Sequence, residues 1–252
     1  MTQVYFIGAG AGDPELITLK GIKAIERADI VIYAGSLVNP EILKYAREGA
    51  EVHNSASMDL EEVLEVMQQG AAQGKLIARV HTGDPAIYGA IQEQMDALAE
   101  MGISFEVIPG VSSFLAAAAA LRQEYTLPDV TQTVILTRME GRTPVPEKEK
   151  LAQLARHGAT MCIFLSIHAI DDVVAQLREG YAEDAPIAVV QKASWPDEKI
   201  VRGTLADIAE KVREAGISKT AMIVVSNVFR GQYEKSKLYD PGFSHGYREG
   251  KS

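Results

Sequence analysis

Three glycine-containing loops carry the residues whose types and spacing could do chemistry. They are residues 8–14 (GAGAGDP), 82–89 (TGDPAIYG) and 109–113 (PGVSS), and each follows a short apolar segment of strand-like composition. Glycine lets the backbone approach a ligand closely, and loops at the carboxyl ends of parallel strands form the ligand sites of open α/β sheets. Together, the three loops predict a ligand site in the first half of the chain.

The first loop invites comparison with the dinucleotide fingerprint G-x-G-x-x-G. Its third glycine, Gly12, comes one residue too early, and residues 13–14 (DP) stand where a helix should open toward a pyrophosphate. The next predicted strand runs into residues 34–36 (AGS), which offer no acidic group to a ribose hydroxyl. A nicotinamide-dependent oxidoreductase is therefore a remote alternative.

The second loop has an interpretation that needs no ligand. Its Gly-Asp-Pro sequence is typical of a helix start, with Asp84 as the N-cap and Pro85 at the first helical position. Both interpretations remain open for this loop.

Other kinds of site are disfavoured by residue spacing. The five histidines, at positions 53, 81, 157, 168 and 245, form no pair at helical spacing, so we expect no metal site. The single cysteine, Cys162, excludes an internal disulfide framework, and its apolar neighbours favour a core position over a nucleophile. Neither a G-x-S-x-G elbow nor a Walker loop occurs.

Apolar runs rich in β-formers alternate with amphipathic segments of helical period, which indicates an α/β fold with largely parallel sheets. The predicted strands are 4–7, 30–33, 76–81, 105–108, 134–137, 161–165, 187–191 and 222–228. The predicted helices are 19–28, 60–73, 90–101, 112–122, 148–156, 169–178 and 205–215.

Composition limits the partners and the location. The chain has 252 residues, 25 basic against 34 acidic, and a net charge of -9, which argues against nucleic acid or an anionic membrane as partner. Its longest apolar run, 114–121, is far shorter than the roughly 20 residues of a membrane span, and the first residues lack the basic region of a signal peptide. We therefore expect a cytoplasmic protein.

The loops, in this order, resemble those of the tetrapyrrole (corrin/porphyrin) methyltransferases. The resemblance covers nearly the whole chain, at residues 8–18 (GAGAGDPELIT), 28–38 (ADIVIYAGSLV), 78–90 (ARVHTGDPAIYGA), 107–114 (VIPGVSSF), 159–167 (ATMCIFLSI) and 220–225 (TAMIVV). The branch that methylates precorrin-4 at C-11 in cobalamin synthesis is resembled at residues 33–38, 92–94, 126–149, 193–205 and 236–248. One departure is Ala11, where the family commonly has proline.

The resemblance implies two α/β domains with a cleft between them and a homodimer. The N-terminal domain, 1–113, would contribute the glycine-rich loops and the cofactor and substrate cleft; the C-terminal domain would be 114–232, followed by a polar and aromatic tail, 233–252. The methyl donor would be S-adenosylmethionine, with S-adenosylhomocysteine as product. Its implied contacts are Ala11, Thr82, Gly83, Asp84, Ile87, Ser112, Ser113, Leu165, Ala193, Ala221 and Met222.

Methyl transfer from a sulfonium needs an aligned nucleophile more than a strong acid or base. The expected nucleophile is the electron-rich macrocycle carbon itself, so no catalytic residue is assigned; Tyr88 is a candidate for removing the proton after methylation.

The substrate that the resemblance implies, precorrin-4 or cobalt-precorrin-4, would bear acetate and propionate carboxylates. A chain of net charge -9 needs local positive charge to bind them, and Arg138 and Arg142 are the candidates because guanidinium groups bind carboxylates in bidentate fashion. The alternative for these arginines is surface pairing with Glu140, Glu147 or Glu149.

Two further functions remain open. The chain could methylate another tetrapyrrole carbon, on uroporphyrinogen III or a different precorrin. It could also be a regulatory module that binds the cofactor without turnover.

Overall fold

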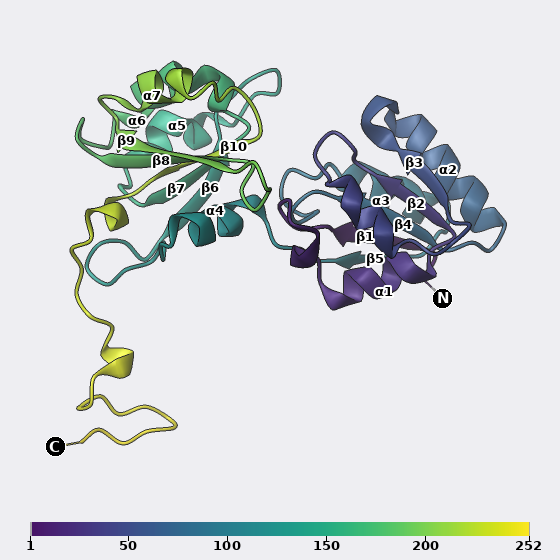
Figure 1. Ribbon diagram of the computed structural model, residues 1–252, viewed down its shortest axis with the longest axis horizontal. Helices are drawn as coiled ribbons and strands as arrows, with labels where there is room; N and C mark the ends of the chain where they lie inside the picture. The colour runs from purple at the N-terminus through teal and green to yellow at the C-terminus, as the bar shows by residue number, and fades with distance from the viewer. Residues whose placement is uncertain (1, 252) are drawn as a thin grey trace. The chain divides into compact units, whose positions relative to one another are not determined.

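The computed structural model describes residues 2–251 and divides the chain into two compact units (Figure 1). The first unit contains the residues up to Ala117 together with Lys192–Glu198, and the second contains Ala118–Gln191 and the residues from Lys199 onward. The predicted boundary between 113 and 114 and the observed division after Ala117 both fall in the helix α4 (Ser113–Leu121).

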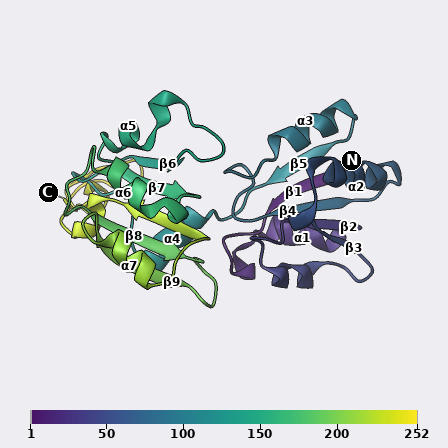
Figure 2. The same ribbon diagram turned by 90° about the horizontal axis from the view of Figure 1, so that it is seen from above.

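The first unit has a sheet of five parallel strands in the order β3-β2-β4-β1-β5, which can be followed in Figure 2. The strands are β1 (Val4–Gly8), β2 (Ile30–Tyr33), β3 (Glu51–Asn54), β4 (Ile77–His81) and β5 (Phe105–Ile108). All five carboxyl ends therefore lie at one edge, and the three glycine-containing loops leave β1, β4 and β5 at that edge.

Helices cover both faces of this sheet. The helix α1 (Leu19–Arg27) packs on one face, whereas α2 (Leu60–Ala72) and α3 (Gln92–Glu100) pack on the other (Figure 1). Side chains along a strand alternate between faces, so in β4 Ala78 and Val80 join the core beneath α1, while Ile77 joins the core beneath α2 and α3. Arg79 and His81 follow Ile77 at spacing two and point to the same side as Ile77.

The second unit has five strands in the order β6-β7-β10-β8-β9. They are β6 (Val134–Arg138), β7 (Thr160–Phe164), β8 (Pro186–Gln191), β9 (Lys199–Thr204) and β10 (Ala221–Val225). The prediction of largely parallel sheets holds for the first unit and is wrong here: only β6 and β7 are parallel, and the other three pairings are antiparallel. The reason is the β8–β9 hairpin, whose two strands reverse direction without a crossover helix.

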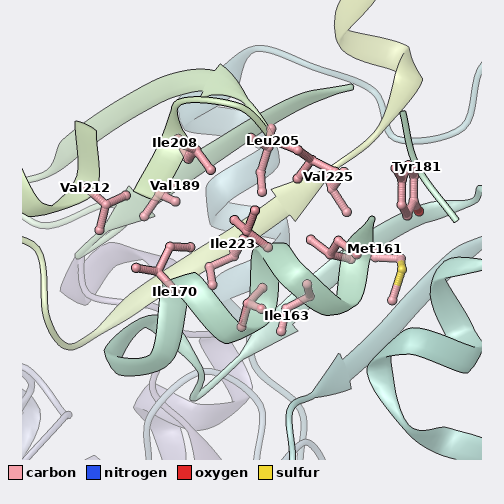
Figure 3. Packing of buried hydrophobic residues seen from close by; sticks show 14 of the residues in the cluster. Met161, Ile163, Ile170, Tyr181, Val189, Leu205, Ile208, Val212, Ile223 and Val225 are labelled. Carbon is pink, nitrogen blue, oxygen red and sulfur yellow. The ribbon is translucent and has the colours of Figure 1, made fainter. Parts of the chain in front are cut away.

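The main core of the second unit lies between this sheet and α5 (Leu151–Ala155), α6 (Ile170–Leu177) and α7 (Ile208–Glu214). Figure 3 shows Ile163 of β7 and Ile223 of β10 packed against Ile170 of α6, with Ile208 and Val212 of α7 in the same cluster. Burial of this apolar surface is the main stabilising contribution to the unit.

Most predicted elements are confirmed to within a few residues, but two strands were missed. Val52 of β3 is exposed and β3 lies at one edge of its sheet; β9 lies at the edge of the other, with an exposed Ile200. Edge strands of this kind lack the continuous apolar run by which a buried parallel strand is recognised.

Residues 233–251 include one short helical turn, Lys237–Tyr239, and the end of this tail turns back on itself, where Lys251 N donates to the Pro241 carbonyl at 2.7 Å (Figure 1). Four aromatic side chains of this tail, Tyr233, Tyr239, Phe243 and Tyr247, are exposed. No helix among residues 2–251 combines the length and apolar character that crossing a membrane requires.

Candidate functional site

The three glycine-containing loops meet at the carboxyl edge of the first sheet. Gly10 and Gly83 exchange backbone hydrogen bonds: Gly83 N donates to Gly10 O at 2.8 Å, and Gly10 N donates to Gly83 O at 3.3 Å. A Cβ on Gly8 would lie 2.6 Å from the backbone of both Gly110 and Gly83, and one on Gly110 would collide with the Gly83 carbonyl. Only glycine at positions 8 and 110 allows the three loops to approach this closely.

Asp84 fastens the second loop to the third. Its Oδ2 accepts a hydrogen bond from Gly110 N at 2.9 Å, and its Oδ1 accepts one from Ala86 N at 2.8 Å. The alternative interpretation of this loop, in which Asp84 caps a helix, is wrong, because residues 85–88 form turns and α3 begins only at Gln92. The carboxylate instead holds two loops in register.

Backbone at the predicted cofactor residues is tightly constrained. Gly83 has φ +62°, a left-handed backbone conformation that residues with a side chain rarely adopt. The atom nearest to a Cβ built on Gly83 would be Ser112 Cα, at 3.5 Å. Ser112 is buried, and its carbonyl accepts the amide of Leu115 at 3.0 Å at the start of α4. The structure thus brings Thr82, Gly83 and Asp84 together with Ser112 and Ser113 within one unit.

The segment Lys192–Glu198 packs on the first loop. Asp13 N donates to Ser194 Oγ at 3.0 Å, and Trp195 Nε1 donates to the Ala11 carbonyl at 3.0 Å. Any side chain at Gly12 would strike the Trp195 indole. Ala193 of this segment is buried in the same unit. Most of this segment lies within a stretch that carries the family resemblance, residues 193–205, but no local pattern indicated that Trp195 shapes the first loop.

The predicted cofactor residues of the second unit gather at one end of its sheet. Leu165 directly follows β7, and the antiparallel register that pairs Ile163 with Ile223 places Ala221 opposite it. Leu165 has φ 54° and is 60% exposed, which is unusual for a leucine, whereas Met222 is buried.

Left-handed backbone recurs beside the predicted site residues. Among the described residues, 2–251, eight non-glycine residues have positive φ, including Tyr88, Ala90, Lys192, Ser194 and Thr220 in addition to Leu165. Such strain tends to cluster at functional sites, where the surrounding structure holds it in place. Six of these positions are predicted site residues or lie beside them, whereas Arg122 and Asp129 do not.

The two arginines predicted to bind substrate differ in the structure. Arg138 donates to the carbonyls of Met139, Thr143 and Pro144 at 3.0–3.3 Å, so its guanidinium holds the following loop in shape. Arg142, in that loop, is exposed. Neither forms an ion pair with a glutamate in the part of the chain that the structure describes.

A pocket of about 260 Å³ opens at the same edge of the first sheet, on the side covered by α2 and α3. It is lined by Tyr88, Thr82 and Ile87 of the second loop, and by residues that sequence reasoning missed: Arg79, His81, Gln94 and Ser55. Arg79 and His81 lie in an otherwise apolar predicted strand. The alternation of side chains between the two faces of a strand is the only sequence signal that places them on the same face as Ile77.

The polar residues of the pocket are deeply buried. Arg79, His81 and Gln94 are 7%, 5% and 5% exposed. Burial lowers the pKa of Arg79 to about 10, so it keeps its charge at neutral pH. Burial, followed by the neighbouring Arg79 charge, lowers the pKa of His81 to about 3, so that imidazole is neutral.

Comparisons with known proteins agree over nearly the full chain. The family model for Tetrapyrrole (Corrin/Porphyrin) Methylases matches residues 3–209. A cobalt-precorrin-4 C(11)-methyltransferase of Methanocaldococcus jannaschii is 60% identical over 249 residues, covering 98% of this chain and 96% of the relative.

Two solved structures are similar in fold. A cobalt precorrin-4 methyltransferase has a TM-score of 0.87 at 52% identity, covering 90% of this chain and 95% of that one. A uroporphyrin-III C-methyltransferase of Thermus thermophilus, complexed with S-adenosyl homocysteine, has a TM-score of 0.77 at 26% identity and covers 91% of this chain and 100% of that one. On the family match, the full-length identity and the shared fold, the chain belongs to the tetrapyrrole (corrin/porphyrin) methylases.

Proposed function

We propose that this protein transfers a methyl group to C-11 of precorrin-4, or of its cobalt form, in cobalamin biosynthesis. The observation that carries the proposal is the 60% identity, over 98% of the chain, to a relative named as a cobalt-precorrin-4 C(11)-methyltransferase. The solved cobalt precorrin-4 methyltransferase of the same fold supports it.

S-adenosylmethionine is the proposed methyl donor. When bound, it supplies a methyl group on a sulfonium, with a neutral thioether as the leaving group. The residues of the first unit fit such a ligand, because Gly83 carries no Cβ and backbone groups of three loops converge there. The relative complexed with S-adenosyl homocysteine supports this assignment. The proposed contacts of this unit are Ala11, Thr82, Gly83, Asp84, Ile87, Ser112, Ser113 and Ala193, and those of the second unit are Leu165, Ala221 and Met222.

These residues are proposed to bind and orient the cofactor and to exclude water from it. A reaction between a sulfonium and an electron-rich carbon gains most from alignment, which rigid loops supply. Asp84 is proposed to act mainly by holding the second and third loops together, as its two backbone hydrogen bonds indicate. Tyr88, exposed beside the pocket, remains the proposed group for accepting the proton.

Labelled S-adenosylmethionine and defined tetrapyrroles test the proposal. Mass spectrometry should show one added methyl group on precorrin-4 or cobalt-precorrin-4, and cleavage to substituted fragments should place it at C-11. Methylation of uroporphyrinogen III instead would identify the alternative substrate. Tight binding of S-adenosylhomocysteine without turnover of any tetrapyrrole would identify a regulatory module.

We also propose that the protein is a homodimer, as the family resemblance implies. Light scattering after size-exclusion chromatography should give twice the chain mass of 27.3 kDa. A monomer mass at micromolar concentration would contradict it.

A further inference from the structure

Arg79 is a buried cation that has no anionic partner within the described residues. Its Nε donates to the amide oxygen of Gln94 at 3.2 Å, and its Nη1 donates to the hydroxyl of Ser55 at 2.9 Å. Both acceptors are neutral. Charged side chains are almost never buried unless they are paired, because the lost hydration must be replaced.

The third nitrogen of this guanidinium borders open space. Nη2 forms no hydrogen bond in residues 2–251. It is also not one of the unpartnered nitrogen atoms that protein atoms fully enclose, so it is accessible from outside. Arg79 lines the pocket of about 260 Å³, so Nη2 is available to a group that enters it.

His81 is a second polar side chain without a complete set of partners. Its Nε2 is buried and has no hydrogen-bond partner among the described residues, while its ring lies 6.1 Å from that of Phe6. This nitrogen is enclosed, so His81 enters the proposal only as the neutral neighbour of Arg79. It lies on the same face of β4 as Arg79 and lines the same pocket.

The acidic residues at the pocket do not neutralise Arg79. Asp59 accepts the amide of Glu62 at 2.9 Å as the cap of α2, and Glu93 forms no ion pair within residues 2–251. The cation is therefore left for a group from outside the chain.

The pocket is too small for a whole macrocycle. Sites for drug-sized ligands span about 300–1,000 Å³, so a volume of about 260 Å³ suits one side arm of a larger ligand. The pocket shares Thr82 and Ile87 with the proposed cofactor loop, so a ligand anchored here would lie next to that loop.

We propose that Arg79, with His81 beside it, binds a carboxylate group in this pocket. The identity of this carboxylate rests on the proposed function: it is an acidic side arm of the tetrapyrrole. Arg79 thereby helps to select and orient the substrate. A carboxylate is the proposed ligand because Nη2 of the charged guanidinium offers N–H donors, and hydrogen bonds from a charged donor to a carboxylate are strong.

Substitution of Arg79 tests the assignment by separating substrate from cofactor affinity. Arg79→Gln should raise the KM for precorrin-4 by about 10-fold or more, because the binding free energy of a hydrogen bond to a charged group corresponds to a change of that size. The Kd for S-adenosylhomocysteine, measured by calorimetry, should be unchanged. Arg79→Lys keeps the charge without the fork and should fall between. Arg27→Gln is the matched control, because it removes an exposed arginine of the same unit. An unchanged precorrin-4 KM in folded Arg79→Gln overturns the proposal.

A second variant keeps the test decisive if Arg79→Gln fails to fold. Gln94→Glu places a resident carboxylate at the position whose oxygen lies 3.2 Å from Arg79 Nε. It should neutralise the guanidinium internally and raise the precorrin-4 KM. A lower or unchanged KM would contradict a carboxylate as the ligand.

Acetate distinguishes a free carboxylate from a side arm of the substrate. Sodium acetate should inhibit the wild-type enzyme competitively with the tetrapyrrole, relative to sodium chloride at equal ionic strength, but should not inhibit Arg79→Gln in this way. If acetate raises the Tm of the wild-type protein but Arg79→Gln leaves the precorrin-4 KM unchanged, the ligand of the pocket is a free carboxylate. That result would overturn the assignment of the pocket to the substrate. Absence of methyl transfer by wild type would overturn the proposed function instead, and the acetate-dependent Tm would still test the pocket.

Discussion

The indole N–H of Trp195 donates a hydrogen bond to the backbone carbonyl of Ala11 across 184 positions of sequence. Because Gly12 leaves room for the indole and Ser194 accepts the amide of Asp13, one short segment fixes the whole turn of the first loop. The geometry of the proposed cofactor site therefore depends on a residue remote in sequence from all three glycine loops.

Trp195→Phe should weaken cofactor binding while keeping the fold. Phenylalanine keeps a ring against Gly12 but loses the hydrogen bond to Ala11, which is worth about 0.5–1.5 kcal/mol net, so the Kd for S-adenosylhomocysteine should rise by roughly 2- to 10-fold. Calorimetry measures this Kd. Trp195 is the only tryptophan, so quenching of its fluorescence in wild type provides an independent reading. Unchanged affinity would show that the first loop holds its shape without this bond.

Cys162 should be dispensable for turnover. It is fully buried in β7, and burial raises the pKa of its thiol to about 12, so no thiolate is available at neutral pH. Cys162→Ala should cost about 1 kcal/mol of unfolding free energy through lost packing, with kcat unchanged. Denaturant unfolding and initial rates measure the two. A loss of turnover at unchanged stability would contradict the structural role.

His81 should make stability depend on acid pH. Its pKa falls from the ordinary value near 6.5 to about 3 on folding, so below pH 6.5 the unfolded state binds a proton that the folded state does not. The unfolding free energy should then decrease by about 1 kcal/mol per pH unit as pH falls from 6.5 toward 5. Urea unfolding of His81→Gln in parallel isolates this contribution, because the variant should lack that part of the slope. Equal slopes in both proteins would mean that His81 is protonated in the fold.

Arg138 and Arg142 should separate into a structural and a binding role. Arg138→Ala removes hydrogen bonds to three carbonyls and should lower the Tm, with any kinetic effect following from loss of the loop's shape. Arg142→Ala should leave the Tm unchanged and raise the precorrin-4 KM by about 10-fold, as for the loss of a charged hydrogen bond. Thermal denaturation and initial rates distinguish them. If Arg142→Ala changes neither quantity, the macrocycle is bound without it.

Much of this protein could be predicted from local sequence. The strands β2 and β5 were predicted with their observed limits, Ile30–Tyr33 and Phe105–Ile108, because a short segment rich in β-forming residues is a local signal. The three glycine loops were also recognisable, since a backbone approach that excludes Cβ leaves glycine as the residue. The resemblance carried by these loops led to the family that the comparisons establish.

The sequence by itself determined the alternation of strands and helices, the loops at the strand ends and the family. Tertiary structure alone decided the antiparallel pairings of the second sheet, the hydrogen bonds by which Asp84 joins two loops, and the contact of Trp195 with Ala11. It also decided that Arg79 is a buried cation, because neighbouring strands and two helices enclose it. The physical reason is the same throughout: periodicity reports which residues prefer burial, whereas partners and charge balance depend on segments that only folding brings together.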